Sequence, residues 1–240
     1  MNKAWSEENK AMRALLKKEA TFSQGVARLL ALRESLFAEI LRMEEELPRE
    51  AFWQMPFAGA AGYHSKTLAY SVWHIFRIED IVTHELITAA PQVLFAGDYL
   101  ARIGADRSTT GNELAGEAIR DFSRQLDTKA LLAYAGAVNN ETAGILRALT
   151  FRESKRKMGE AERTRLENSG CVSTDESAAW LVDYWCGKDV CGLVKMPLSR
   201  HWIMHIEAML RIENKLKKYE KCAQRSLDML PVRIYFGPLP

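Results

Sequence analysis

The sequence predicts an all-α fold built on four main helices. In four long segments, apolar residues recur at the three- and four-residue spacing of an amphipathic helix. No segment with a period of two is long enough to require a β-sheet. Prolines, glycines and small polar residues separate the segments and indicate turns. We therefore expect one all-α domain over residues 1–240.

The first two helices are predicted near the N-terminus. Residues 7–20 are charged and rich in alanine, a composition that favours a helix. Thr21 and Ser23 are suitable caps for a second helix, whose apolar residues continue to Leu41. The second helix should end at Leu47, because the residue before a proline avoids helical geometry.

The next helix is predicted over about 65–89. Residues 52–63 contain proline, glycine and aromatic side chains and indicate the loop before it, and Pro91 ends it. Residues 95–112 contain three glycines and a Ser-Thr-Thr cluster, and we expect a long connecting loop there. Loops of this length in compact domains are often functional.

Short helices are predicted on both sides of the third main helix. A short helix at about 113–124 precedes the third main helix, at about 128–150. Residues 152–168 mix both charge signs and indicate a solvated helix face. Another short helix is expected at 175–186, with its aromatic side chains packed inward.

The last main helix should run from about Leu198 to Glu220. Residues 230–238, which include two prolines and a glycine, indicate an extended C-terminal tail.

Composition excludes several classes of protein. Hydrophobic residues make up 48% and charged residues 27% of the chain, which is typical of a soluble globular protein. A net charge of +2 lacks the basic excess of a nucleic-acid binder. The chain has no apolar run of about 18 residues and no apolar leader at its start. We expect a cytoplasmic protein with no nucleic-acid or membrane partner.

The four cysteines form no close Cys-x-x-Cys pair. Reduced thiols are the default in a cytoplasmic chain. Cys186 and Cys191 are the candidates for a redox or metal role, because they precede the histidine pair described next.

Two histidines lie four residues apart in the last predicted helix. His201 and His205 share one face with Ala208, Met209 and Ile212, so both imidazoles should point into the domain. Two imidazoles at this spacing can bind one divalent ion. A buried imidazole also needs a partner, because an unpaired polar group in the interior costs free energy.

His74, on the predicted helix at 65–89, is the candidate third ligand. His64 and His84 are each ten residues from it, about 80° around the helix, and are poorer candidates. A triad of His74, His201 and His205 requires only that the two helices be neighbours. The alternative is three core histidines hydrogen-bonded to backbone or to Tyr, Asp and Glu side chains.

Six further residues bear on the chemistry of this site, of which Glu207, two residues past His205, should point elsewhere. Glu79 and Asp80 are expected behind the ligands or at the surface, and Arg77 is expected in a surface salt bridge. Tyr70, one turn before His74, could offer a hydroxyl near a metal. Lys188 is expected to be exposed, with a small chance of meeting substrate.

Several motifs resemble the DinB/YfiT-like family of metalloenzymes. Two of them contain the histidines: YSVWHIFRIED at 70–80 is similar to that family's second-helix motif, and MPLSRHWIMHIEA at 196–208 to its fourth-helix motif. Three segments resemble the family less specifically: WLVDYW at 180–185, IGADRSTTG at 103–111 and FSRQLD at 122–127. The resemblance covers roughly residues 20–222.

The resemblance implies a four-helix bundle with one histidine from the second helix and two from the fourth. The matching positions here are His74, His201 and His205, which would hold a divalent metal. Zinc or nickel is the first expectation, with iron and cobalt as alternatives. Many family members have further histidines just after the fourth-helix pair, whereas residues 206–209 contain none.

Three functions are consistent with these features. The first is a metal-dependent enzyme, a transferase or hydrolase that acts on a small molecule, with a low-molecular-weight thiol as a candidate cosubstrate. The second is a non-catalytic, stress-associated metal-binding protein. The third is a helical bundle that acts only in protein association. A homodimer is compatible with each, and no residue is assigned as a general acid or base.

Overall fold

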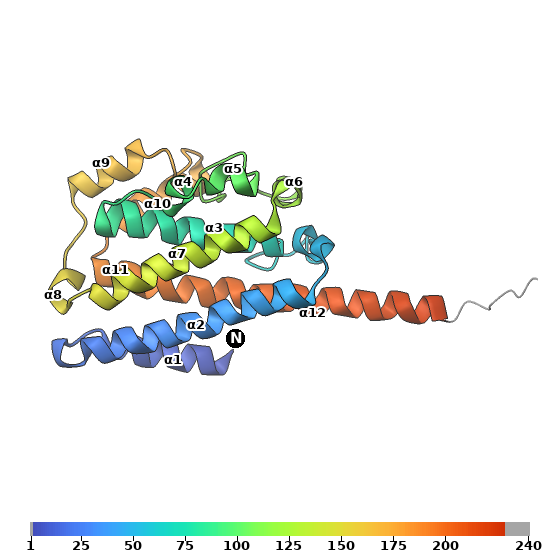
Figure 1. Cartoon of the computed structure of the whole chain (residues 1–240), viewed down its shortest axis with the longest axis horizontal. Coiled ribbons are helices and arrows are strands. Elements are labelled where there is room, and N and C mark those ends of the chain that lie inside the picture. Colours follow the sequence, from blue (N-terminus) through green and yellow to red (C-terminus); the bar gives the residue numbers. More distant parts are fainter. Residues whose placement is uncertain (1, 229–240) are drawn as a thin grey trace, which may run out of the picture.

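The computed structural model describes the backbone of residues 2–228 and the side chains of residues 2–222. This part of the chain is helical and contains no β-strand, so the all-α prediction is confirmed. The long elements are α1 (Lys3–Leu15), α2 (Phe22–Glu46), α3 (Leu68–Ile81), α7 (Thr128–Ala148) and α12 (His201–Asp228) (Figure 1). None of the described helices is both long and apolar enough to span a membrane.

Shorter elements connect the long helices. The short α-helices are α4 (Val93–Ala96), α5 (Tyr99–Ile103), α6 (Glu117–Gln125), α8 (Phe151–Ser154), α9 (Glu160–Asn168), α10 (Glu176–Cys186) and α11 (Val190–Lys195). Two 3-10 turns, η1 (Glu19–Thr21) and η2 (Arg49–Trp53), flank α2. Two π-helical segments, η3 (Val82–Thr88) and η4 (Met196–Arg200), adjoin α3 and α12.

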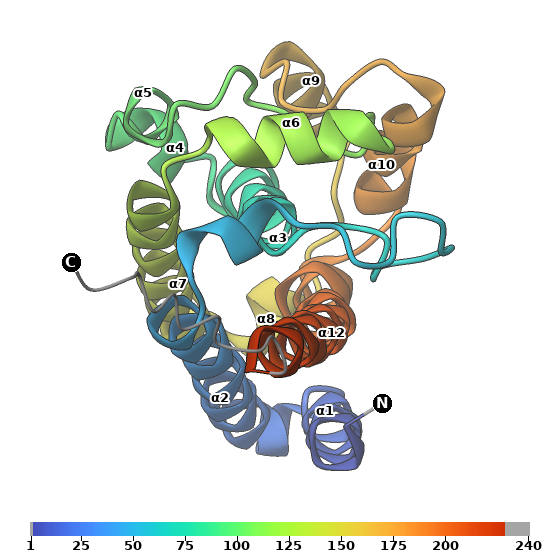
Figure 2. The same ribbon diagram turned by 90° about the vertical axis from the view of Figure 1, so that its right-hand side faces the viewer.

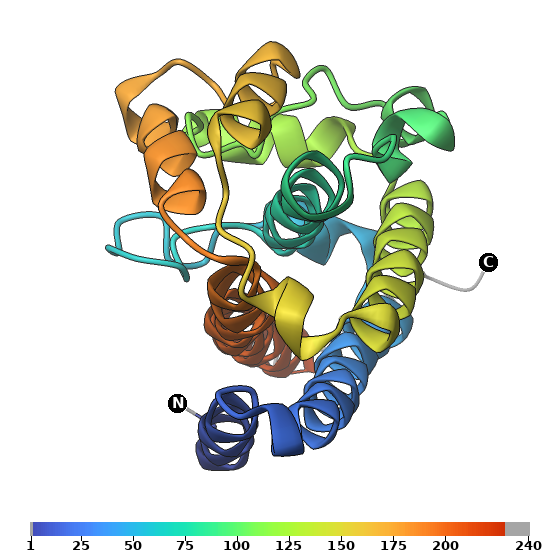
Figure 3. The same ribbon diagram turned by 90° about the vertical axis from the view of Figure 1, so that its left-hand side faces the viewer.

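Four of the long helices surround a shared core. α2 and α3 each contact both α7 and α12, and Figure 2 shows the four helices nearly end-on. α1 lies outside this group against α2, whereas α4, α5, α6, α9 and α10 lie on the side of α3, as the opposite view also shows (Figure 3).

α3 is enclosed on every side. Each residue from Thr67 to His84 is buried, because η2, α4 and α6 cover the faces that α7 and α12 leave open. Charged side chains on such a helix must be paired internally. Arg77 is therefore not in a surface salt bridge as expected; it is fully buried and pairs with the carboxylate of Asp80 at 2.9 Å.

The ends of several elements differ from expectation for local reasons. α3 begins at Leu68 because the Thr67 hydroxyl accepts a hydrogen bond from the Tyr70 amide. Its continuation η3 ends at Thr88, just before Ala89 with φ 57°. The predicted loop at 95–112 contains the end of α4 and all of α5.

Two C-terminal predictions have different outcomes. The charged stretch at 152–168 forms two helices, α8 and α9, separated by residues 155–159. The extended tail predicted at 230–238 lies outside the described residues.

Candidate metal site

The fold brings together the three histidines that the sequence singled out. His74 comes from α3, and His201 and His205 come from successive turns at the start of α12. One ligand nitrogen from each can be chosen so that all three lie within 4.8 Å of one another. The imidazole centroids are 4.5–5.0 Å apart. Among the described residues this is the one group of three or more histidine, cysteine or acidic side chains so arranged.

All three imidazoles are buried and uncharged at neutral pH. Burial, partly offset by a hydrogen bond to the Thr110 backbone, lowers the pKa of His74 to about 4. Burial and the neighbouring imidazoles hold the pKa values of His201 and His205 well below the usual value. Neutral imidazoles keep the lone pair that a metal ligand needs.

The tautomer of His74 is set by the loop that follows α5. His74 Nδ1 lies 2.8 Å from the carbonyl oxygen of Thr110, so Nδ1 must donate and Nε2 is left with its lone pair. This is the arrangement by which proteins orient metal-binding histidines through the second ring nitrogen.

The Thr110 bond belongs to a series of four between α3 and this loop. Side chains of α3 donate to four consecutive carbonyls, from residue 108 to residue 111: Arg77 to Ser108, Trp73 to Thr109, His74 to Thr110 and Tyr70 to Gly111. The loop is therefore held along one face of α3. The Tyr70 hydroxyl donates its proton to Gly111, so that proton is not available at the histidine cluster.

Three of the four ring nitrogens of the α12 pair are buried without a protein partner. His201 Nδ1 and both ring nitrogens of His205 are buried with no hydrogen bond among the described residues. The alternative, in which all three histidines are core residues hydrogen-bonded to other protein groups, therefore fits only His74. Buried polar atoms without partners are rare in native proteins and call for an explanation such as a bound ion.

A buried ion pair fixes the start of α12. Arg33 of α2 donates to both carboxylate oxygens of Glu79, at 2.6 and 2.8 Å, and to the backbone oxygen of Leu198 in η4. The indole of Trp202 donates to the same carboxylate at 2.9 Å. Glu79 thus lies behind the histidine pair and joins α2, α3 and α12.

Pro197 contributes to the geometry at the same point. It lies at the first turn of the π-helical segment η4, where a missing backbone N–H is tolerated. π-Helical turns are frequent at functional sites, and this one directly precedes His201.

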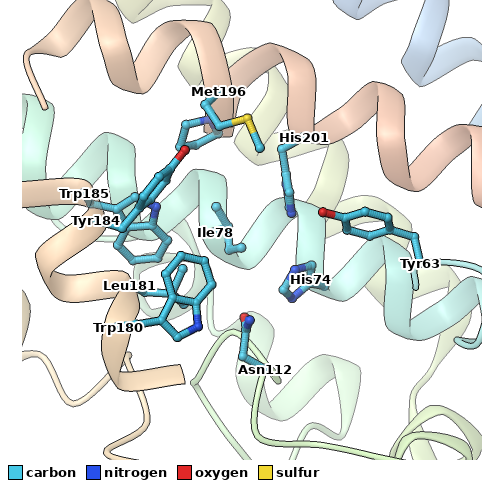
Figure 4. Close-up of a pocket in the computed structure, with 11 residues that line it drawn as sticks. Tyr63, His74, Ile78, Asn112, Trp180, Leu181, Tyr184, Trp185, Met196 and His201 are labelled. Carbon is cyan, nitrogen blue, oxygen red and sulfur yellow. The ribbon is translucent and has the colours of Figure 1, made fainter. Parts of the chain in front are cut away.

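The site borders a cavity of about 230 Å³. Figure 4 shows His74 and His201 at one end of it, with the Tyr63 ring and the Asn112 amide beside them. Residues of α10 form the opposite wall: Trp180, Leu181, Tyr184 and Trp185. Trp185 and Leu181 are buried as expected, whereas Trp180 is half exposed.

Sequence patterns did not identify the loop residues of this site. Thr110, Asn112 and Tyr63 lie in segments without periodicity, and only the composition of 95–112 indicated a functional loop. Lys66 was also missed; it is half-buried, its charge acts on His74 and His205, and burial lowers its own pKa.

Other candidates from the sequence lie apart from the three histidines. Asp80 is buried in a network with Arg77 and His84. Lys188 is half-buried rather than exposed, with its Nζ 4.0 Å from the ring centroid of Tyr184.

The cysteines and the remaining histidine are also outside the cluster. Cys186 and Cys191 are free thiols, and neither joins the three histidines. The ring of His64 packs against Phe57.

Comparison of the chain with models of known protein families and with curated proteins found no match.

Proposed function

We propose that this protein is a metal-dependent enzyme in which His74, His201 and His205 hold one divalent ion. The observation that carries the proposal is the set of buried ring nitrogens without partners on α12, facing a histidine whose tautomer is already fixed. Nitrogens bound at about 2.1 Å to one tetrahedral zinc ion are about 3.4 Å apart. The three nitrogens here lie within 4.8 Å of one another, so the imidazoles would rotate toward one another on binding the ion.

The donor set indicates the chemistry. Three neutral imidazoles suit zinc or nickel first, and iron or cobalt also. Three protein ligands leave a position for water or substrate, and a bound divalent ion supplies Lewis acidity there. Two features of the chain support catalysis rather than storage: the cavity next to His74 and His201, and the Tyr63 and Asn112 side chains at its border.

The reaction we propose is group transfer or hydrolysis on a small molecule. In a thiol transfer, the thiol sulfur forms a bond to an electrophilic carbon, the S–H proton passes to solvent, and the leaving group departs with its electron pair. In a hydrolysis, water takes the place of the thiol. The largely apolar wall of α10 would keep bulk water away from either reaction.

The arrangement also supports a relationship to the DinB/YfiT-like family. α3 is the second and α12 the last of the four long helices that surround the shared core, and the ligands divide between them as one and two. These are the positions that the family's bundle would assign to its metal ligands. We propose this relationship together with the function, and a non-catalytic metal-binding protein is the alternative.

Metal analysis of the purified protein tests the site. We expect about one divalent ion per chain, or recovery of that amount when the apoprotein is incubated with zinc or nickel. His201→Ala should abolish retention, whereas His64→Ala, a histidine outside the cluster, should leave it unchanged. Substoichiometric metal that cannot be restored, or equal retention by the two variants, would exclude the site.

A second experiment separates enzyme from metal-binding protein. The metal-loaded protein is assayed with thiols and carbon electrophiles, and separately with ester and amide substrates. Turnover that requires metal and is lost in His201→Ala supports the enzyme. Tight metal binding without turnover of any substrate class would favour the non-catalytic alternative.

A further inference from the structure

The two ends of the cavity beside the histidines are lined by different kinds of residue. Only His74 and His201 of the cluster line it, both at one end. The far wall is α10, where the Ser177 hydroxyl oxygen lies 3.3 Å from the backbone oxygen of Asn112 in the loop after α5. The cavity therefore lies between the histidine cluster and α10, and the same loop contacts both.

No Asp, Glu, Lys or Arg side chain among the described residues lines this cavity. Its aromatic and apolar lining residues are Tyr63, Ile78, Trp180, Leu181, Tyr184, Trp185, Met196 and Pro197. Trp180 and Tyr184 meet edge to face, with centroids 5.5 Å apart, and the Trp180 indole N–H is already bonded to the Ser177 backbone oxygen. The wall thus presents mainly ring surface.

Most polar groups of the lining are at the histidine end, although α10 adds the Tyr184 hydroxyl. The Asn112 side-chain oxygen accepts from the Thr110 hydroxyl at 2.8 Å, which leaves the amide N–H groups to face a ligand. The Tyr63 hydroxyl lies beside His201 in Figure 4. A ligand would therefore meet most of its polar partners at the histidine end.

The volume limits the size of the ligand. An apolar cavity of about 150 Å³ is large enough for benzene. At about 230 Å³, this cavity has room for one aromatic ring with a short substituent. Apolar pockets with a few polar groups at one end are typical of sites that orient small molecules.

From these observations we infer that the cavity binds a neutral compound the size of a single aromatic ring, with its one polar group directed at the histidines. The inference rests on the proposed function, because the compound that binds in the cavity is taken to be the substrate of the proposed metal site. A multiply charged thiol would have to keep its charged part outside the cavity, since burying an unpaired carboxylate costs several kcal/mol. The ring-bearing partner in the reaction is then the electrophile or ester.

The inference is tested by fluorine NMR with matched probes. 4-Fluorobenzyl alcohol and 4-fluorobenzoate have the same ring and differ in charge, and 4-fluorotoluene lacks the polar group. In the metal-free protein, where a carboxylate would be buried unpaired, we expect the alcohol to bind at least about tenfold more tightly than the benzoate. Equal or tighter binding of the benzoate by the metal-free protein would overturn the inference.

Variants locate the probe. Trp180→Ala removes part of the aromatic wall and should weaken binding of the alcohol about three- to tenfold. Phe95→Ala is the matched control, because Phe95 is 49% and Trp180 50% exposed, and Phe95 lies away from the cavity. Tyr63→Phe should bring the affinities for the alcohol and the toluene closer together. Equal effects of Trp180→Ala and Phe95→Ala would place the probe elsewhere.

Zinc retention is measured on the same samples, so that the two proposals can fail separately. Retained zinc without probe binding overturns the assignment of the cavity and leaves the metal site standing. Selective probe binding by a protein that retains no metal supports the cavity's ligand class and contradicts the proposed metal enzyme.

Discussion

Glu79 is the residue whose removal should cost the protein most stability. It accepts two hydrogen bonds from Arg33 and one from Trp202, and its side chain is fully buried. Glu79→Gln leaves the Arg33 charge without its counterion, and breaking a buried pair in this way costs about 3–5 kcal/mol. Urea unfolding of the two proteins measures the difference.

The control for this prediction is an exposed ion pair. Arg28 and Glu8 are 2.9 Å apart, but both side chains are about half exposed. Glu8→Gln should therefore change the free energy of unfolding far less than Glu79→Gln. Similar losses in the two variants would show that the Arg33–Glu79 pair does not stabilise the fold.

At the residue scale, the sequence predicted the arrangement of side chains correctly where it depends only on their spacing along one helix. His201 and His205 are four residues apart, and helical geometry alone aligns them. It failed for Arg77, because a helical wheel assumes that one face meets solvent. Every residue of α3 is buried, so angular position could not tell a surface residue from an interior one.

At the scale of elements, the loop over residues 104–116 holds His74 in place. Its four consecutive carbonyls accept from the α3 side chains, and the sequence could not predict this because each bond joins residues more than 30 positions apart. Only the final chain geometry brings them together. The composition of residues 95–112 predicted a functional loop, but it did not predict that the backbone carbonyls of this loop accept hydrogen bonds from α3.

Gly111 is the position where this loop is most sensitive. Its φ is +78°, and an added Cβ would lie 3.1 Å from Cε2 of Tyr70. Gly111→Ala should destabilise the protein by about 1–3 kcal/mol through backbone strain and this contact. It should also weaken metal binding, because the Thr110 carbonyl that orients His74 is the adjacent group.

Gly116→Ala is a matched control for Gly111→Ala. Gly116 also has a positive φ, +53°, but an added Cβ there meets nothing within 4 Å. It should therefore lose stability from strain alone and keep the metal affinity of the wild type. Calorimetric titration of both variants with zinc makes the comparison, and equal affinities in the two would count against the role given to the loop.

At the scale of the whole molecule, a bound metal should stabilise the fold. The three histidines join α3 to α12, helices that are more than a hundred residues apart in sequence. Zinc at about 100 times its dissociation constant should add about 2.7 kcal/mol to the free energy of unfolding. The gain should be absent in His205→Gln, whatever that variant's own stability, and an equal gain in both proteins would indicate binding elsewhere.

The second effect on the whole molecule is a pH dependence that originates at His84. This side chain is fully buried at the end of α3, and its Nδ1 lies 2.8 Å from the carboxylate of Asp80. Burial alone would lower the pKa of His84, but the hydrogen bond and charge of Asp80 raise it to about 9. From α7, Glu141 lies 3.3 Å from Nε2, within ion-pair distance but without hydrogen-bond geometry.

The sign of the effect follows from the two pKa values. The pKa of His84 is about 9 in the folded chain, against an ordinary value of 6.5, so the protonated form stabilises the fold. The full contribution is present below about pH 6.5 and is lost as the pH rises through 9. Its upper limit is about 3.5 kcal/mol, at about 1.4 kcal/mol for each pKa unit.

Three groups near His84 keep their protonation state in this pH window. Arg77 stays protonated, Asp80 stays ionised because its pKa is lowered, and the pKa of Tyr134 is raised well above its usual value. The metal-site histidines have lowered pKa values, so their protonation affects stability at acidic pH instead.

Urea unfolding of the metal-free protein between pH 6 and pH 9.5 measures the effect. The free energy of unfolding of the wild type should fall across this range more steeply than that of His84→Gln. All other titrating groups are common to the two proteins, so the difference between the curves isolates His84. His64→Gln, which changes a histidine outside the Asp80 network, should follow the wild type. Parallel curves for the wild type and His84→Gln would mean that His84 is uncharged in the folded chain at neutral pH.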